Sequence, residues 1–166
     1  MNANPSVTHL NKIRVMAVDS AEQVRRIDEA IARRAYEIFE LRGGTGWHEL
    51  EDWRKAESEV RSKLCFSLST AAASLRVGFD VARFQEGTVE VWVAPRQMTI
   101  CGKAIPHKEQ SERAAPLYEG MVFRAIALPV EVDPGRAVAN VKRNFVEIRL
   151  PLACVTYGVE VPAKAA

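Results

Sequence analysis

The residues that could carry chemistry are few in this sequence and lie far apart. The histidines His9, His48 and His107 share no metal-ligand spacing with Cys, Asp or Glu, so we predict no metal site. The glycine-rich run at residues 43–46 follows no strand pattern and precedes no Lys-Ser or Lys-Thr pair, so it does not fit a phosphate-binding loop. The sequence contains no G-x-S-x-G elbow, although a Ser-His-Asp site assembled from distant segments stays open. We therefore predict no catalytic residues, no cofactor and no enzymatic activity.

The cysteines favour a structural role over a reactive one. Cys65, Cys101 and Cys154 form no C-x-x-C pair and leave an odd number, which argues against both a disulfide framework and a zinc site. We interpret them as small buried hydrophobic residues in a reducing compartment. Residues 1–10 hold no apolar segment typical of a secretory signal, and no apolar run approaches the ~20 residues of a membrane span. The sequence therefore predicts a cytoplasmic protein without a membrane partner.

Composition indicates an ordinary globular protein. The 166 residues are enough for one domain, or for a small domain with an appendage. Apolar residues make up 48% and charged residues 27%, which argues against disorder. The formal charge of +2 is too small to predict a nucleic acid or a membrane surface as a partner.

Paired arginines are the one feature that favours nucleic acid. Arg25-Arg26 and Arg33-Arg34 lie about two helical turns apart and could contact phosphates from one helix face. Acidic residues are interspersed among them, which instead favours ion pairs between residues one turn apart on a solvated helix. We expect nucleic-acid binding to be the less favoured of the two interpretations.

The first part of the chain has the apolar spacing of two amphipathic helices. We interpret Ser20 with Gln23 as a capping box, followed by the first helix, which the glycines at residues 43–44 end. A second helical pattern follows after a short turn. The two apolar stripes consist of Val24, Ile27, Ile31, Ala35 and Ile38, and of Leu50, Trp53, Ala56, Val60 and Leu64.

These patterns predict a helical hairpin over residues 20–64, preceded by a flexible N-terminus at residues 1–19. Trp47 and Trp53 are expected to anchor the packing of this small unit, which has few other large side chains to bury. Its motifs, A-Y-E-I-F-E at residues 35–40 and H-E-L-E-D-W with A-E at residues 48–57, resemble a short bacterial domain family of unknown function. That resemblance covers about residues 31–60 and implies a helical hairpin without an activity.

From Cys65 onward the hydrophobic period changes to two. The valines at residues 89, 91 and 93 alternate with Glu90 and Trp92, and the same alternation returns at residues 146–150. Several short strands with frequent turns and no intervening helix predict an antiparallel sandwich over residues 65–153. Because the period changes near Leu64, we expect each half to bury its own apolar face.

Four motifs in this half resemble the alpha-crystallin domain of small heat-shock proteins. They are M-T-I-C-G at residues 98–102, L-P at 128–129, the hairpin A-N-V-K-R-N-F-V at 139–146, and L-P at 150–151. The resemblance implies a mainly β, immunoglobulin-like antiparallel β-sandwich that serves as a binding surface. The family's hairpin turn carries a glycine, and here we expect Asn144 to take the positive φ that the turn requires.

The same resemblance implies a groove at the edge of the sandwich that receives a tail. The tail at residues 154–166 contains V-E-V, similar to the family's I/V-x-I/V motif, whose two flanking side chains point to one side of an extended chain. The groove would lie between the strands at residues 89–93 and 137–141. The tail residues are Val159 and Val161, and the groove candidates are Val89, Val91, Val93, Val138 and Val141.

The resemblance also implies a dimer. Arg124 matches the family's interface arginine, with Tyr118 expected beside it, although a solvated arginine on a polar strand face is equally compatible with the alternation. Residues 103–120 are too long for a hairpin turn and would exchange a strand between subunits, or else form a plain flexible linker.

Taken together, the motifs predict an ATP-independent chaperone that binds partly unfolded proteins and itself, as a dimer and higher oligomer. The alternative is a non-enzymatic adaptor, similar to co-chaperone scaffolds, whose helical hairpin binds one specific partner.

Overall fold

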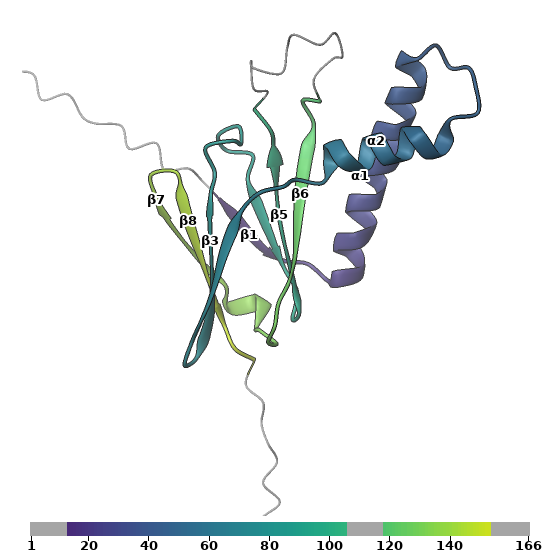
Figure 1. The fold of residues 1–166 in the computed structure, drawn as a ribbon. Coiled ribbons are helices and arrows are strands. Elements are labelled where there is room, and N and C mark those ends of the chain that lie inside the picture. The colour runs from purple at the N-terminus through teal and green to yellow at the C-terminus, as the bar shows by residue number, and fades with distance from the viewer. Residues whose placement is uncertain (1–12, 106–117, 154–166) are drawn as a thin grey trace, which may run out of the picture.

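A computed structural model describes residues 13–105 and 118–153 of the chain. A helical hairpin stands beside a β-sandwich, and its loop end projects away from the sheets (Figure 1). The helical elements are α1 (Ser20–Leu41), α2 (Glu49–Val60) and the short 3-10 helix η2 (Pro134–Arg136). The strands are β1 (Arg14–Ala17), β2 (Phe66–Ala71), β3 (Ser74–Asp80), β4 (Glu90–Val93), β5 (Gln97–Lys103), β6 (Met121–Ala127), β7 (Val138–Lys142) and β8 (Phe145–Pro151).

Two four-stranded sheets make the sandwich. One has the order β1-β4-β5-β6 and the other the order β2-β3-β8-β7. Strands β2 to β8 pair with their neighbours in antiparallel register, whereas β1 runs parallel to β4. Alternate residues of both sheets fill the space between them, among them Val77, Val91, Ile100 and Ile148. The predicted antiparallel sandwich with a preceding helical hairpin is confirmed.

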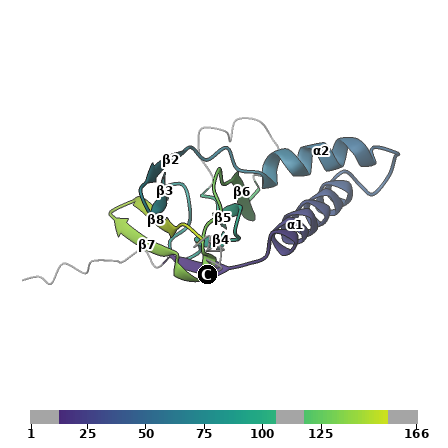
Figure 2. The same cartoon turned by 90° about the horizontal axis from the view of Figure 1, so that it is seen from below.

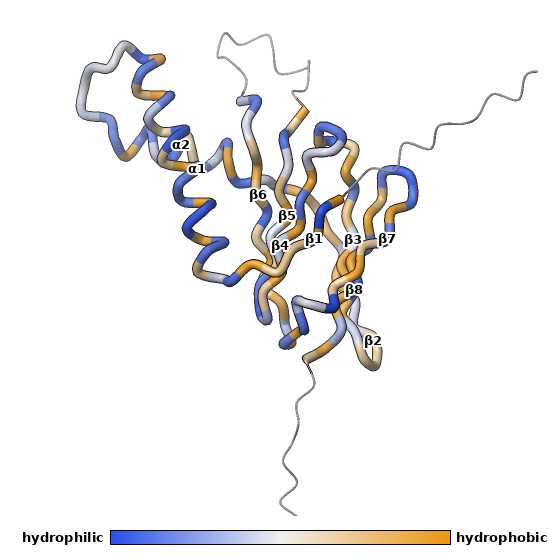
Figure 3. The backbone as a smooth tube through the Cα atoms, turned by 180° about the vertical axis from the view of Figure 1, so that it is seen from behind, coloured by the Kyte–Doolittle hydropathy of each residue, from blue (hydrophilic) through white to orange (hydrophobic). Residues whose placement is uncertain are grey.

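The hairpin covers the outer face of the first sheet. Ile27 and Ile31 of α1 and Val60 of α2 form one buried cluster with Trp92 of β4 and Phe123 of β6. Figure 2 shows both helices on one side of the sandwich, and Figure 3 shows hydrophobic and hydrophilic residues alternating along them. Amphipathic helices of this kind are stabilised mainly by tertiary packing of their apolar face.

This shared cluster differs from the expectation that each half buries its own apolar face. The hairpin buries its apolar stripe on the sheet because a two-helix unit has too little interior of its own. The expected anchors are therefore exposed: Trp47 is 95% accessible and Trp53 38%. Val24 and Leu50 of the predicted stripes also face outward.

The start of α1 corrects the predicted capping box. The N-cap is Asp19, and Ser20 is already helical. Gln23 is fully buried and its Nε2 donates to the Val18 carbonyl at 2.8 Å, so it does not reach back to cap the helix. The predicted end is confirmed, because α1 finishes at Leu41 and Gly43 follows with a φ of 97°.

The N-terminal segment holds a strand where the sequence suggested a flexible chain at residues 1–19. Residues 14–17 form β1, with the Arg14 amide donating to the Val89 carbonyl at 3.3 Å. Just after the strand, the Val18 amide donates to the Val93 carbonyl at 2.9 Å. A four-residue edge strand shows too little alternation to be recognised as a strand from sequence.

The β7-β8 hairpin corrects one turn residue. Lys142 pairs with Phe145, so the loop between them contains Arg143 and Asn144. Arg143 takes the positive φ, at 55°, and not Asn144. A two-residue hairpin loop with a positive φ at its first position fits the twist of its flanking strands, and here that geometry outweighs the preference of Asn for such a conformation.

Replacing Ile31 with alanine tests the shared cluster. Ile31 is 1% exposed between helix and sheet, so Ile31→Ala should lower the free energy of unfolding by about 2–5 kcal/mol. The matched control is Val24→Ala on the same helix, where Val24 is 48% exposed, and its effect should stay within about 0.5 kcal/mol. Urea denaturation followed by far-UV circular dichroism measures both, and equal effects would contradict the packing described.

Candidate functional site

The groove candidates do not share one exposed surface. Val89, Val91 and Val93 point between the two sheets, where they belong to the sandwich core. Val141 is half-buried and packs against the same core, whereas Val138 on β7 is 53% exposed and points outward. The structure therefore brings four of the five candidates together and leaves Val138 apart.

The edge of β4 is occupied by the chain itself. β1 lies along it, with Arg14 opposite Glu90 and Val15 opposite Val91. Ile13 and Val15 are half-buried and pack against the sandwich core. Val159 and Val161 lie outside the described residues, so their docking at this edge stays a prediction. Sequence reasoning missed β1, although Ile13-Arg14-Val15 has the same alternation as the tail motif.

The two predicted dimer residues lie on different surfaces. Arg124 sits opposite Ile100 on β6, an edge strand, and its guanidinium lies 5.3 Å from the ring centre of Phe66. Its Nε is buried and meets no acceptor among the described residues. Tyr118 packs towards α1, and its hydroxyl donates to the Met121 carbonyl at 2.9 Å. Their role in a dimer stays a prediction, and most of the loop expected to exchange, residues 106–117, lies outside the described residues.

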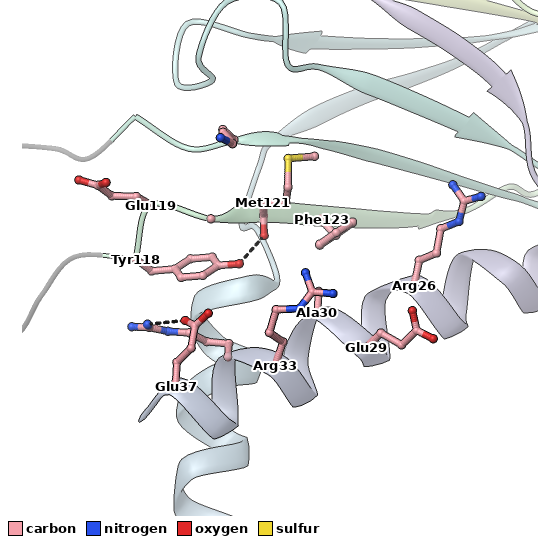
Figure 4. A pocket seen from close by; sticks show the side chains of 12 residues that line it. Arg26, Glu29, Ala30, Arg33, Glu37, Tyr118, Glu119, Met121 and Phe123 are labelled. Carbon is pink, nitrogen blue, oxygen red and sulfur yellow. Dashed lines mark hydrogen bonds and ion pairs between the residues drawn. The ribbon is translucent and has the colours of Figure 1, made fainter. Parts of the chain in front are cut away.

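A cleft of about 520 Å³ lies between α1 and the beginning of β6 (Figure 4). Arg34, one of the residues that line the cleft, is buried, with its Nε 2.5 Å from Glu59 and a terminal nitrogen 3.1 Å from Glu37. Burial alone would lower the pKa of Arg34, but the hydrogen bonds from Glu59 and Glu37 raise it above its ordinary value. The cleft is lined by both positive and negative side chains. Its buried Arg34 pairs with Glu59 of α2 and Glu37 of α1, and these ion pairs join the two helices.

Arg25, Arg26 and Arg34, three of the four arginines in the α1 pairs, form ion pairs with glutamates, as the solvated-helix interpretation expected. Arg25 and Arg26 both bind Glu22, at 2.7 and 2.8 Å. Their hydrogen bonds lower the pKa of Glu22 to about 2. Arg26 also lies 5.0 Å from the ring centre of Trp92 and covers the edge of the helix-sheet cluster. These contacts engage the guanidinium groups within the protein.

Several large apolar side chains of the hairpin are exposed to water. Leu41, Trp47, Leu50 and Trp53 lie around the connection between α1 and α2, and we refer to these four residues as the hairpin tip. Arg42 and Asp52, joined at 2.7 Å, hold the two helices together beside them. Sequence reasoning expected the two tryptophans inside the hairpin and so missed this surface.

Reactive groups are not assembled in the part of the chain that the structure describes. No three His, Cys, Asp or Glu side chains lie together there as a metal site would require. None of the helices described is long and apolar enough to cross a membrane. The Cys101 thiol is buried, and burial raises its pKa to about 12, so almost none of it is thiolate at neutral pH.

Cysteine labelling tests this environment. At pH 8 an alkylating reagent should modify the exposed Cys65 rapidly and Cys101 only after unfolding, because the nucleophile is the thiolate. Mass spectrometry of peptides after timed quenching measures each site separately. Equal modification of both sites in the folded protein would contradict the burial of Cys101.

Comparisons with known proteins found one family model and a set of solved structures. Residues 27–62 match the family model described as a protein of unknown function, DUF2934. No curated protein matches the chain.

The similar solved structures include several heat-shock proteins. Heat shock protein 16.0 from Schizosaccharomyces pombe is 15% identical, with 56% of this chain and 89% of that chain covered and a TM-score of 0.43. HspA from Xanthomonas axonopodis is 18% identical, with 54% and 92% covered and a TM-score of 0.43. A small heat-shock protein from Xylella fastidiosa is 17% identical, with 58% and 91% covered and a TM-score of 0.44.

These likenesses are distant, and the sandwich is identified by its own strand order and register. Residues 27–62 of the chain thus match the DUF2934 model, and the chain is structurally similar to small heat-shock proteins at low identity.

Proposed function

We propose that this protein is an ATP-independent chaperone that binds partly unfolded proteins and suppresses their aggregation. The observation that carries the proposal is the hairpin tip, where two tryptophans and two leucines near the connection between α1 and α2 are exposed to water. Large apolar side chains gathered on a surface mark an interaction site, because their burial by a partner is favourable. Unfolding proteins present the complementary surface, since they expose apolar side chains that are normally internal.

The rigid attachment of the hairpin supports this role. Gln23 accepts a hydrogen bond from the buried hydroxyl of Thr99 at 2.7 Å, and Arg34 ties α1 to α2. The tip therefore projects from a fixed base and does not need to fold before it binds. Holding a client requires only that bound apolar surface is removed from water, and no chemical step is needed.

Assembly is the second part of the proposal. Arg124 and Tyr118 are proposed to contribute to a dimer, and the tail residues Val159 and Val161 to link dimers into larger oligomers through the β4 edge. The buried Nε of Arg124 meets no acceptor in residues 13–105 and 118–153, which supports a partner at β6, because such a group is costly to leave unpaired. Several tips on one oligomer would bind one client with increased avidity.

An aggregation assay tests the function. The full chain should suppress the heat- or reduction-induced aggregation of unrelated proteins at molar excess, to the same extent with and without ATP. Light scattering over time measures this, with an equal mass of an inert protein as the control. Absence of protection, or protection that depends on ATP, would overturn the proposal.

Substitution at the tip tests which surface binds. Trp47→Ser with Leu50→Ser should leave the melting temperature nearly unchanged, because both side chains are exposed, yet weaken client protection about tenfold or more. The matched control is Val24→Ser, an exposed apolar residue on the same hairpin away from the tip. Full protection by the tip variant would show that clients bind elsewhere.

The tip also supports the alternative, an adaptor that presents the hairpin to one specific partner. A nearly fully exposed tryptophan such as Trp47 is typical of an interface anchor that fills one pocket. The aggregation assay separates the two functions, since an adaptor should protect none of the unrelated proteins.

A further inference from the structure

The outer face of the second sheet carries two arginines directly opposite each other. Arg76 of β3 pairs in register with Arg149 of β8, the neighbouring strand. The residues next to them, among them Val77 and Ile148, point into the sandwich core, so both arginines point to the other side. Both arginines are exposed to water. The described helices pack on the first sheet and leave this face of the second sheet uncovered (Figure 2).

This arrangement of charges is unfavourable in the protein alone. Like charges directly opposite each other on neighbouring strands are destabilising. Within residues 13–105 and 118–153, no carboxylate forms an ion pair with either guanidinium. In the helical hairpin, by contrast, Arg34 binds Glu59 and Arg42 binds Asp52. The two arginines on the sheet therefore lack a counter-charge that an oxyanion of another molecule could supply.

Two further side chains extend this arrangement across the sheet. Ser69 of β2 lies opposite Arg76 and is exposed. Val138 of β7 lies opposite Arg149 and is 53% exposed. These four residues form one row across all four strands, with a hydroxyl group at one end and an apolar side chain at the other, and we refer to them as the arginine row.

Carboxylates elsewhere on the same face limit what can bind. Glu147 lies two residues along β8 from Arg149 and points to the same side. Two residues further along, Phe145 lies between Asp80 of β3 and Lys142 of β7. A nucleic-acid strand carries a charge at every nucleotide, so phosphates next to those at the arginines would come close to Glu147. A peptide can instead place one carboxylate at the arginines and neutral side chains beside it, so the face favours a peptide.

We propose that the arginine row is a docking site for an extended, acidic segment of a partner protein. A carboxylate of that segment accepts hydrogen bonds from the two guanidinium groups, whose planar donors match carboxylate geometry. An apolar side chain next to the carboxylate covers Val138. The site lies on the sheet that the hairpin does not cover, so it is separate from the hairpin tip and does not depend on the proposed function.

Binding of an acidic peptide tests the arginine row. A fluorescent ten-residue peptide of alternating Glu and Thr is titrated with the full chain, and its anisotropy is followed. The salt concentration is about 0.15 M, where charges more than ~8 Å apart are largely screened. Arg76→Gln with Arg149→Gln should weaken binding about two- to thirtyfold, the range that two exposed ion pairs contribute. The matched control, Arg54→Gln with Lys55→Gln, removes the same charge from exposed positions of α2 and should bind like the natural protein.

Two outcomes of this titration contradict the site. Absence of binding by the natural protein, or an equal loss in both variants, would overturn it. A strand of thymidine nucleotides with the same number of charges is the second probe. If that strand binds more tightly than the peptide and its binding is lost in the Arg76 and Arg149 variant, the face recognises nucleic acid and the proposed acidic segment is wrong.

Urea denaturation separates binding from a structural role of the two arginines. Because their charges repel, Arg76→Gln with Arg149→Gln should keep or raise the urea midpoint of the protein without peptide. The peptide has no apolar side chain and the assay contains no unfolded client, so a failed aggregation assay leaves this test unaffected. A lower midpoint would show that the arginines stabilise the fold, and it would overturn the proposal.

Discussion

Burial of the outer face of the first sheet is the constraint on which the rest of the structure depends. One face of an antiparallel sheet commonly meets water, but here Trp92, Cys101 and Phe123 make that face apolar. The helices supply its cover with Ile27, Ile31 and Val60. The helical hairpin therefore completes the packing of this sheet by burying its outer face.

A single buried polar contact fixes how the helices lie on the sheet. Gln23 and Thr99 are both fully buried, and each satisfies part of the other's hydrogen-bonding capacity. Shifting α1 by one residue would leave both groups unpaired, which costs more than the hydrogen bond itself contributes. The apolar cluster favours docking in general, and this pair selects one register. That register in turn places the chain before α1 alongside β4 and leaves the hairpin tip in water.

The sequence predicted those parts of the fold that depend on periodicity. Ile27, Ile31 and Ile38 follow the helical repeat, and the alternating residues of the sheets follow the period of two, so both halves were recognisable. The surroundings of individual side chains could not be recognised from the sequence. Trp47 is large and apolar, which suggested that it packs inside the hairpin. The docked arrangement shows that the apolar faces of the helices pack on the sheet instead and leave Trp47 exposed. In the β7-β8 turn the positive φ falls on Arg143, because strand register outweighs residue preference there.

The candidate site was predictable only in outline. Val89, Val91 and Val93 were expected to line an edge groove, but their inward direction and the presence of β1 beside β4 depend on the pairing of segments distant in sequence. In the proposed chaperone function the hairpin stays docked while its tip and the sandwich edges bind clients and other copies. Hydrogen exchange of the full chain, with and without a heat-unfolded client, tests this most directly. We expect amides of α1 near Ile31 and of β4 to stay protected in both states, while residues 41–53 gain protection when the client is present. Loss of protection in α1 on client binding would contradict the account, because it would show that the working form releases the hairpin from the sheet.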